Sequence, residues 1–180
     1  MQRLLESLQF AAEKHSEHRR KNVGATPYIN HPIDVALCLS RCGITDEAIL
    51  IAAVLHDTVE DTETSFEEIQ TLFGPRVCSL VRDMTDDKDL PKMERKQFQV
   101  DHASQLCDAS KQIKIADKIC NLQSVIEDPP KGWDEARRLD YLEWARAVFQ
   151  GAKGVNTELD ALFMQTYERG LLQILSCDSR

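Results

Sequence analysis

The chain has 180 residues, of which 42% are hydrophobic and 29% charged, the balance of one soluble globular domain with a substantial core. Its longest apolar run, around residues 49–55, is far shorter than the roughly 20 residues of a membrane span, and no signal-peptide pattern opens the chain. The net charge of −8 argues against a nucleic-acid duplex as the main ligand, so we expect a cytoplasmic protein with neither a membrane nor a duplex partner.

Cysteine usage fits the same compartment. The chain contains no CxxC pair, and most of its cysteines lie among apolar neighbours. This pattern favours reduced thiols over a disulfide framework and offers no zinc-finger spacing. The six cysteines are Cys38, Cys42, Cys78, Cys107, Cys120 and Cys177.

Apolar residues recur with a helical period along nearly the whole chain. The first predicted helix has an apolar face from Leu4 to His15 and is expected to end in the basic cluster 19–21. A loop follows, and Asn30 is a candidate N-cap for a second helix that Gly43 stops. The pattern indicates helices joined by short loops.

The middle of the chain carries clear start and stop signals. Thr45, with two acidic residues behind it, begins a helix that runs into His56. Ser65 and Glu68 form a capping-box pair that opens a short helix, and Gly74 closes it. These signals predict helix boundaries on both sides of residues 56–61.

The second half continues in the same way, without the two-residue alternation of a strand. We therefore predict an all-α fold, a single-domain bundle of about eight to ten helices. Its remaining predicted elements are a helix from Pro75 to Met84, a polar turn over 85–91, a mixed segment over 92–106, a helix that begins at Asp108 or Ser110 and ends before Pro129, and helices over about 134–150 and 157–175.

The segment HDTVED at 56–61 carries the densest group of candidate ligands. His56 and Asp57 can both bind a divalent cation. Glu60 and Asp61 follow them by four residues each, which is one turn of a helix. Such a turn could hold two metal ligands and two carboxylates that orient or deprotonate a water molecule, as hydrolysis at phosphorus requires. The alternative is a solvated acidic helix end, although acids there oppose the helix dipole.

Two further ligand candidates lie elsewhere. His31 stands at a predicted helix start, and Asp117 interrupts an apolar helix face, where a buried carboxylate is costly unless paired or metal-bound. With the histidine–aspartate doublet they form a set suited to Mn²⁺, Fe²⁺ or Zn²⁺. Each has a structural alternative: an N-terminal capping role for His31, and a salt bridge to Lys118 or Arg137 for Asp117.

These residues, in this order and with these gaps, resemble the HD-domain metal phosphohydrolases. Five ordered motifs narrow the resemblance to the hydrolase domain of the RelA/SpoT alarmone enzymes, and especially to the small stand-alone hydrolases, the animal homologues of SpoT. The resemblance covers essentially the whole chain and implies one HD-type domain over 1–180, without a synthetase or regulatory domain. The motifs are YINHP at 28–32, HDTVED at 56–61, FG at 73–74, VRDMT at 81–85 and IADKICNL at 115–122.

The resemblance also implies a reaction and residue roles. In this family a metal-activated water removes diphosphate from the ribose 3′ position of guanosine tetra- or pentaphosphate, the alarmones of the starvation and stringent responses, and leaves GDP or GTP. One Mn²⁺ is the implied cofactor. By position in the matching motifs, the metal ligands would be His31, His56, Asp57 and Asp117, the catalytic general base and orienting acid would be Glu60 and Asp61, and the substrate-binding residues would be Arg20, Lys21, Lys92, Asn121 and Tyr141.

Substrate binding requires local cations, because the nucleotide carries several negative charges and the protein is acidic overall. The clusters 19–21 and 92–96 could supply them, although each could equally be a solvated helix face. Tyr141 could equally be a core residue, and we interpret Trp133 and Trp144 as packing residues. Two departures concern the edge of the nucleotide pocket, where Cys120 and Gln123 replace residues common in the family.

Two alternatives to alarmone hydrolysis remain at this point. The same chemistry could act on a ribose 2′- or 3′-phosphate of another nucleotide, such as NADPH. The fold could also serve as a nucleotide-binding sensor without turnover. The intact pair of Glu60 and Asp61 argues against the sensor, because family members that have lost hydrolysis lack parts of the His-Asp-Glu-Asp set.

Overall fold

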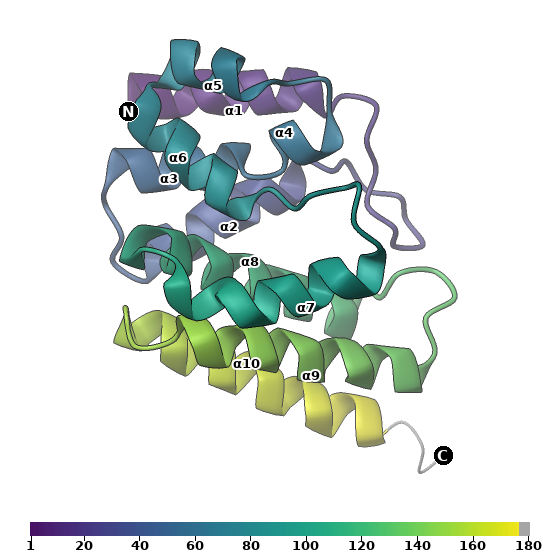
Figure 1. Cartoon of the computed structure of the whole chain (residues 1–180). Coiled ribbons are helices and arrows are strands. Elements are labelled where there is room, and N and C mark those ends of the chain that lie inside the picture. Colours follow the sequence, from purple (N-terminus) through teal and green to yellow (C-terminus); the bar gives the residue numbers. More distant parts are fainter. Residues whose placement is uncertain (177–180) are drawn as a thin grey trace.

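The computed structural model describes residues 1–176, and within them every regular element is a helix (Figure 1). This confirms the all-α prediction. The extended pairings in that range are two isolated β-bridges, Arg19 with Pro27 and Asn22 with Pro130. The elements are α1 (Gln2–Lys14), α2 (Asn30–Arg41), α3 (Glu47–Leu55), α4 (Thr58–Asp61), α5 (Phe66–Phe73), α6 (Pro75–Met84), α7 (Lys92–His102), the 3₁₀ helix η1 (Ala103–Gln105), α8 (Asp108–Glu127), α9 (Glu135–Ala152) and α10 (Thr157–Ser176).

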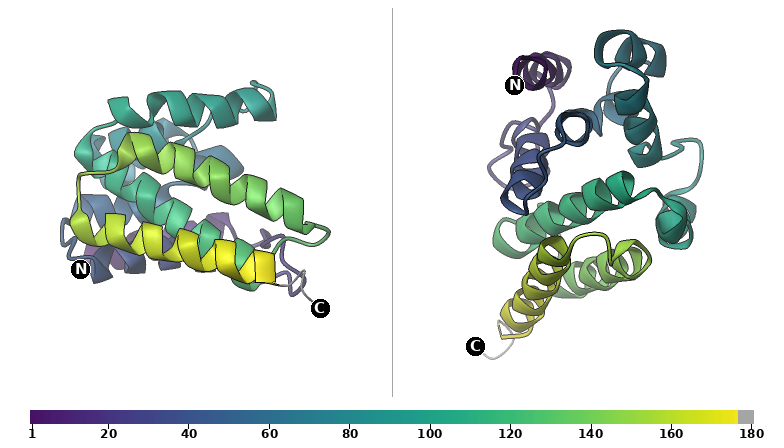
Figure 2. Two further views of the ribbon diagram at one scale, coloured as in Figure 1. Left: turned by 90° about the horizontal axis from the view of Figure 1, so that it is seen from below. Right: turned by 90° about the vertical axis from the view of Figure 1, so that its left-hand side faces the viewer.

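Helix α8 lies at the centre of the bundle. It packs against α2, α3 and α6 on one side and against α9 and α10 on the other (Figures 1 and 2). Ile113, Ile119 and Leu122 of α8 are fully buried, and most of the surrounding core is aliphatic. Because α8 is enclosed on both sides, any polar residue buried along it must face either a partner or a cavity.

The first helix is shorter than the sequence indicated, and that prediction was wrong. Helix α1 ends at Lys14, and the basic cluster 19–21 lies in the loop before α2. The loop folds back on itself: the backbone N–H of Arg20 donates to Thr26 O (2.8 Å), and that of Tyr28 donates to His18 O (3.0 Å). These backbone bonds replace the helical ones and carry the cations toward α8.

Most of the predicted helix boundaries agree with the structure. Asp46 caps α3 by accepting a hydrogen bond from the Ala48 N–H, and Ser65 caps α5 by accepting one from the Glu68 N–H. Gly74 separates α5 from α6, with a φ of +88° that favours glycine. Asn30 is not the N-cap that the sequence suggested, because it is the first residue of α2 and the N-cap position is occupied by Ile29.

Gly151 allows α9 to approach η1 closely. A Cβ at this position would lie 2.8 Å from the Cβ of Ala103 and 3.1 Å from the backbone N of Ser104. Helix propensity favours alanine over glycine by about 1 kcal/mol, but overpacking a rigid contact costs about 1–3 kcal/mol. We therefore expect Gly151→Ala to lower the free energy of unfolding in urea. Gln150→Ala, at an exposed position of the same helix, is the control, and a more stable Gly151→Ala would contradict the packing argument.

None of the helices within residues 1–176 combines the length and the apolar character needed to cross a membrane. The five cysteines in that range are free thiols, and Cys177 lies outside the described residues. Cys38, Cys42 and Cys120 are buried, as their apolar neighbours in the sequence indicated.

Candidate active site

Three helices bring the predicted metal ligands together. His31 is in the first turn of α2, His56 and Asp57 follow the last residue of α3, and Asp117 lies in the middle of α8. The segment 56–61 is not one continuous helix, as its spacing had suggested. The chain turns after Leu55 and restarts at the short helix α4, where the Asp61 N–H still donates to Asp57 O at 2.9 Å.

The ligand atoms converge at one buried point. His31 Nε2 lies 3.1 Å from Asp117 Oδ1, and His56 Nε2 lies 3.7 Å from the same oxygen. One ligand atom from each of His31, His56 and Asp117 can be chosen so that all lie within 4.8 Å of one another. Asp57 Oδ2 lies 3.0 Å from His56 Nε2 and 3.9 Å from His31 Nε2. Two imidazoles and two carboxylates thus surround one position.

The bonding around His56 leaves one ring nitrogen available to a ligand. Its Nδ1 lies 2.8 Å from the carbonyl oxygen of Ala53, an acceptor that fixes the ring with the proton on Nδ1. Its Nε2 is buried and makes no hydrogen bond, although Asp57 Oδ2 is close. An unsatisfied imidazole nitrogen among carboxylate oxygens fits a divalent cation. The donor set therefore suits a metal.

The carboxylates are held by a second layer of side chains. The Tyr28 hydroxyl donates to Asp57 Oδ2 at 2.6 Å, and Asn121 Nδ2 donates to Asp117 Oδ1 at 2.6 Å. Lys118 Nζ donates to Asp117 Oδ2 at 3.0 Å, so the salt bridge considered from the sequence is present beside the histidine contacts. Outer contacts of this kind orient ligands for a metal.

Electrostatics at the cluster favour added positive charge. Burial alone would lower the pKa of His56, but the charges of Asp57 and Asp117 raise it to about 10. The pKa values of both carboxyl groups are lowered despite burial, mainly by the His56 charge for Asp57 and by the Lys118 charge for Asp117. A buried pair of ionised carboxylates that stabilises a cation this strongly is the environment of a metal site.

Glu60 and Asp61 lie beside the ligands, along a small cavity of about 180 Å³. Glu60 Oε2 accepts the Asp86 backbone N–H at 3.2 Å, and burial, followed by the charge of Asp57, raises the pKa of Glu60 to about 6. Asp61 Oδ1 accepts from Lys88 Nζ at 2.9 Å. Glu60 is thus more basic than an ordinary carboxylate and still ionised at neutral pH, which suits a general base.

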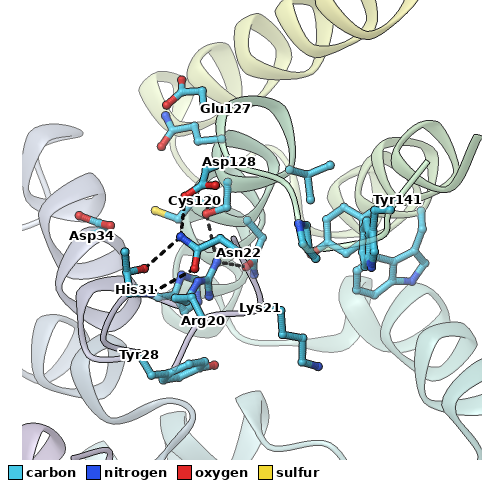
Figure 3. Close-up of a pocket in the computed structure, with 18 of the residues that line it drawn as sticks. Arg20, Lys21, Asn22, Tyr28, His31, Asp34, Cys120, Glu127, Asp128 and Tyr141 are labelled. Carbon is cyan, nitrogen blue, oxygen red and sulfur yellow. Dashed lines mark hydrogen bonds between the residues drawn. The ribbon is translucent and has the colours of Figure 1, made fainter. Parts of the chain in front are cut away.

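A larger cavity of about 830 Å³ adjoins the small one, and several residues line both. All five predicted substrate-binding residues lie on its wall. Arg20 projects from the loop before α2 and donates to Asn121 Oδ1 (3.3 Å), while Tyr141 of α9 stands on the other side (Figure 3). The structure therefore brings the five predicted substrate-binding residues, which are far apart in the sequence, to one cavity. They are Arg20, Lys21, Lys92, Asn121 and Tyr141.

One wall of the larger cavity was predicted only in part, because the family resemblance assigned Tyr141 to substrate binding but not its neighbours along or just before α9. Trp133, Arg137, Tyr141 and Trp144 all line it, and the two tryptophans also pack against the core, as predicted. Lys96 Nζ lies over the Trp144 ring at 4.6 Å from its centroid. The spacing of these four residues along or just before α9 follows a helical face, and a stripe of aromatic and basic residues in place of aliphatic ones was the available signal.

The two departures from the family pattern lie on the same surface. Cys120 and Gln123 both line the larger cavity, at its α8 wall, and neither is among the residues around the metal cluster. The hydrogen-bonding contact with Cys38, followed by burial, raises the pKa of the Cys120 thiol, so it stays protonated. These substitutions therefore alter the pocket edge and leave the ligand set unchanged.

Comparison with known proteins agrees with this geometry. The model of the HD domain family matches residues 7–151. The guanosine-3′,5′-bis(diphosphate) 3′-pyrophosphohydrolase MESH1 of Xenopus tropicalis is 51% identical over 89% of this chain and 93% of its own length. The human protein of the same name is 48% identical over 93% of this chain and 95% of its own length. A solved structure described as a metazoan orthologue of SpoT that hydrolyses ppGpp and plays a role in starvation responses superimposes with a TM-score of 0.90, at 45% identity over 93% of this chain and 94% of that one. The chain belongs to the HD-domain family and, within it, to the MESH1 proteins.

Proposed function

We propose that this protein is a metal-dependent hydrolase that removes the 3′-diphosphate from guanosine 3′,5′-bis(diphosphate) and related alarmones. The observation that carries the proposal is the buried cluster of His31, His56 and Asp117 beside Asp57, which adjoins a cation-lined cavity of about 830 Å³. That volume is within the range of nucleotide-sized ligand sites. The relatives that share the fold over nearly their whole length are named for this activity.

We assign the metal to His31, His56, Asp57 and Asp117, and we propose Mn²⁺, which accepts mixed imidazole and carboxylate ligands. When bound, such an ion supplies Lewis acidity, which lowers the pKa of water and offsets phosphate charge. Tyr28, Asn121 and Lys118 would keep the two carboxylates oriented, because each already donates a hydrogen bond to one of them.

The protein's own side chains then bind, orient and move protons. Glu60, with its raised pKa, would accept the proton of the attacking water, and Asp61 beside it would orient that water. Arg20, Lys21 and Lys92 would neutralise the phosphates in the larger cavity. Tyr141, which is half-buried in the opposite wall, would pack against the nucleoside.

The test is product analysis with guanosine tetraphosphate and Mn²⁺. We expect GDP and diphosphate, in a one-to-one ratio, and no turnover after the metal is removed by a chelator. NADPH offered to the same preparation tests the second substrate class, and a large preference for NADPH in kcat/KM would assign the site to another nucleotide. Nucleotide binding without any released phosphate or diphosphate would favour the sensor.

A further inference from the structure

Lys114 is a buried lysine in α8 that the proposed function does not use. Its side chain is 6% exposed, and it makes no hydrogen bond or ion pair with any of residues 1–176. Lys118, one turn later and equally buried, differs because it is bonded to Asp117. The stem of Lys114 is buried while its Nζ meets the cavity, and an ammonium group held there without an ion-pair partner opposes folding, so a lysine at this position needs a functional reason.

The position of Lys114 beside the metal cluster suggests what this function is. It lines the small cavity of about 180 Å³ beside the metal cluster, together with Glu60 and Asp61. Along α8, Lys114, Asp117 and Asn121 recur at helical spacing on one face, so the ammonium group belongs to the same stripe as a metal ligand. Apart from Met84, every side chain that lines this cavity carries polar atoms.

Five carboxylates and two lysines line the small cavity, so a phosphate group there would depend on the metal and on these lysines for positive charge. Burial lowers the pKa of Lys114, and so does the charge of Lys118, while the carboxylates of Asp117, Asp86 and Asp57 oppose the shift. None of these carboxylates lies within 4.0 Å of its ammonium group. Two of the three, Asp117 and Asp57, belong to the metal in the proposed function. A cation on the wall of a small polar cavity is then free to bind a phosphate oxygen.

We propose that Lys114 is a further catalytic residue, whose ammonium group binds a non-bridging oxygen of the 3′-diphosphate during its hydrolysis. This rests on the proposed function. In that reaction the water oxygen forms a bond to the phosphorus attached to the ribose 3′ oxygen. The bond between this phosphorus and the 3′ oxygen breaks. The electron pair of the broken bond leaves with the 3′ oxygen, which takes up a proton from the solvent. Glu60 takes the proton of the attacking water and later releases it to the solvent. Lys114 stabilises the charge on the transferred group without exchanging a proton.

The test is Lys114→Met, which removes the charge and keeps the length of the chain. With guanosine tetraphosphate and Mn²⁺ we expect kcat to fall about 10²–10³-fold, the usual effect of removing one preorganised donor. Manganese stoichiometry should stay at the wild-type value, and the melting temperature should be unchanged or higher, because an unpaired buried charge is gone. Lys111→Met, on the same helix but lining neither cavity, is the matched control and should match the wild type throughout.

A binding measurement separates this inference from the proposed function. Inorganic diphosphate is titrated calorimetrically into manganese-loaded wild type, Lys114→Met and Lys111→Met at the same free metal concentration. We expect about 10-fold or greater loss of diphosphate affinity in Lys114→Met alone, as for a lost charge-assisted hydrogen bond, with GDP affinity unchanged. If the wild type does not hydrolyse guanosine tetraphosphate, the proposed function fails, and this titration still decides the role of Lys114.

Several outcomes would overturn the inference. Equal diphosphate affinity in the wild type and Lys114→Met would do so, as would wild-type kcat in the variant. A melting temperature that falls together with the metal content would make Lys114 a structural residue instead. Should Lys114→Met not fold, Lys114→Gln undergoes the same measurements, and failure of both variants to fold would also establish a structural role.

Discussion

Replacing His56 with alanine is expected to abolish metal binding and, with it, hydrolysis. The side chain is buried at the end of α3, its Nδ1 is directed to the Ala53 carbonyl, and its Nε2 is the polar atom without a hydrogen bond in the ligand cluster. Loss of an outer-shell partner alone typically costs 10–100-fold in metal affinity, so loss of a ligand should cost more than about 100-fold. Activity should fall to background at manganese concentrations that saturate the wild type.

Metal analysis and thermal unfolding both check this result. A ligand at 100 times its Kd stabilises the folded state by about 2.7 kcal/mol, so manganese should raise the melting temperature of the wild type and leave that of His56→Ala unchanged. His102→Ala, in α7 and outside both cavities, is the control and should behave as the wild type. Wild-type metal content in His56→Ala would remove this histidine from the ligand set.

Replacing Glu60 with glutamine is expected to remove catalysis and keep the metal. Glutamine has nearly the same shape and can still accept the Asp86 N–H, but it cannot take a proton from water. General-base catalysis contributes about 10²–10⁴-fold, and we expect a loss of kcat in that range. The KM and the manganese content should change little, because Glu60 is placed beside the ligand cluster and not within it.

Glu63→Gln is the matched control, since Glu63 is exposed in the loop just after α4 and lines neither cavity. It should retain wild-type kcat. Asp61→Asn should lose less activity than Glu60→Gln if Asp61 only orients the water, and it should retain its metal as well. Unchanged turnover in both Glu60→Gln and Asp61→Asn would refute the roles assigned to these carboxylates.

The sequence was sufficient for most of the helices, although not for α7 in the mixed segment 92–106, and for the identity of the ligand candidates. Helical periodicity and start signals such as Ser65 are local, so they could be read before any tertiary contact was known; the start predicted at Thr45 lies one residue before the observed cap, Asp46. The doublet of His56 and Asp57 was also visible locally. His31 and Asp117 lie 86 residues apart; their ligand chemistry and the resemblance to family motifs grouped them before the structure placed them 3.1 Å apart.

The prediction for the basic cluster 19–21 was wrong because contacts with distant residues determine the conformation there. The basic cluster 19–21 was expected at the end of a helix, yet Arg20 lies in a loop whose backbone bonds to Thr26 and whose side chain reaches α8. Trp133 and Trp144 pack against the core as interpreted, but they also line the cavity, which a helical stripe cannot reveal. Which face of an element meets the pocket is a property of the packing between helices and not of the segment.

The sequence by itself determined an all-helical fold, the ligand types and the carboxylates beside them, because residue chemistry and helical period are properties of short segments. Only the tertiary structure decided that α2, α3 and α8 bring two histidines and two aspartates to one buried point, and that Lys114 lies beside them without a partner. Burial and charge pairing depend on how the helices pack together, and burial raises the pKa of Glu60 to about 6 while Lys114 faces the small cavity.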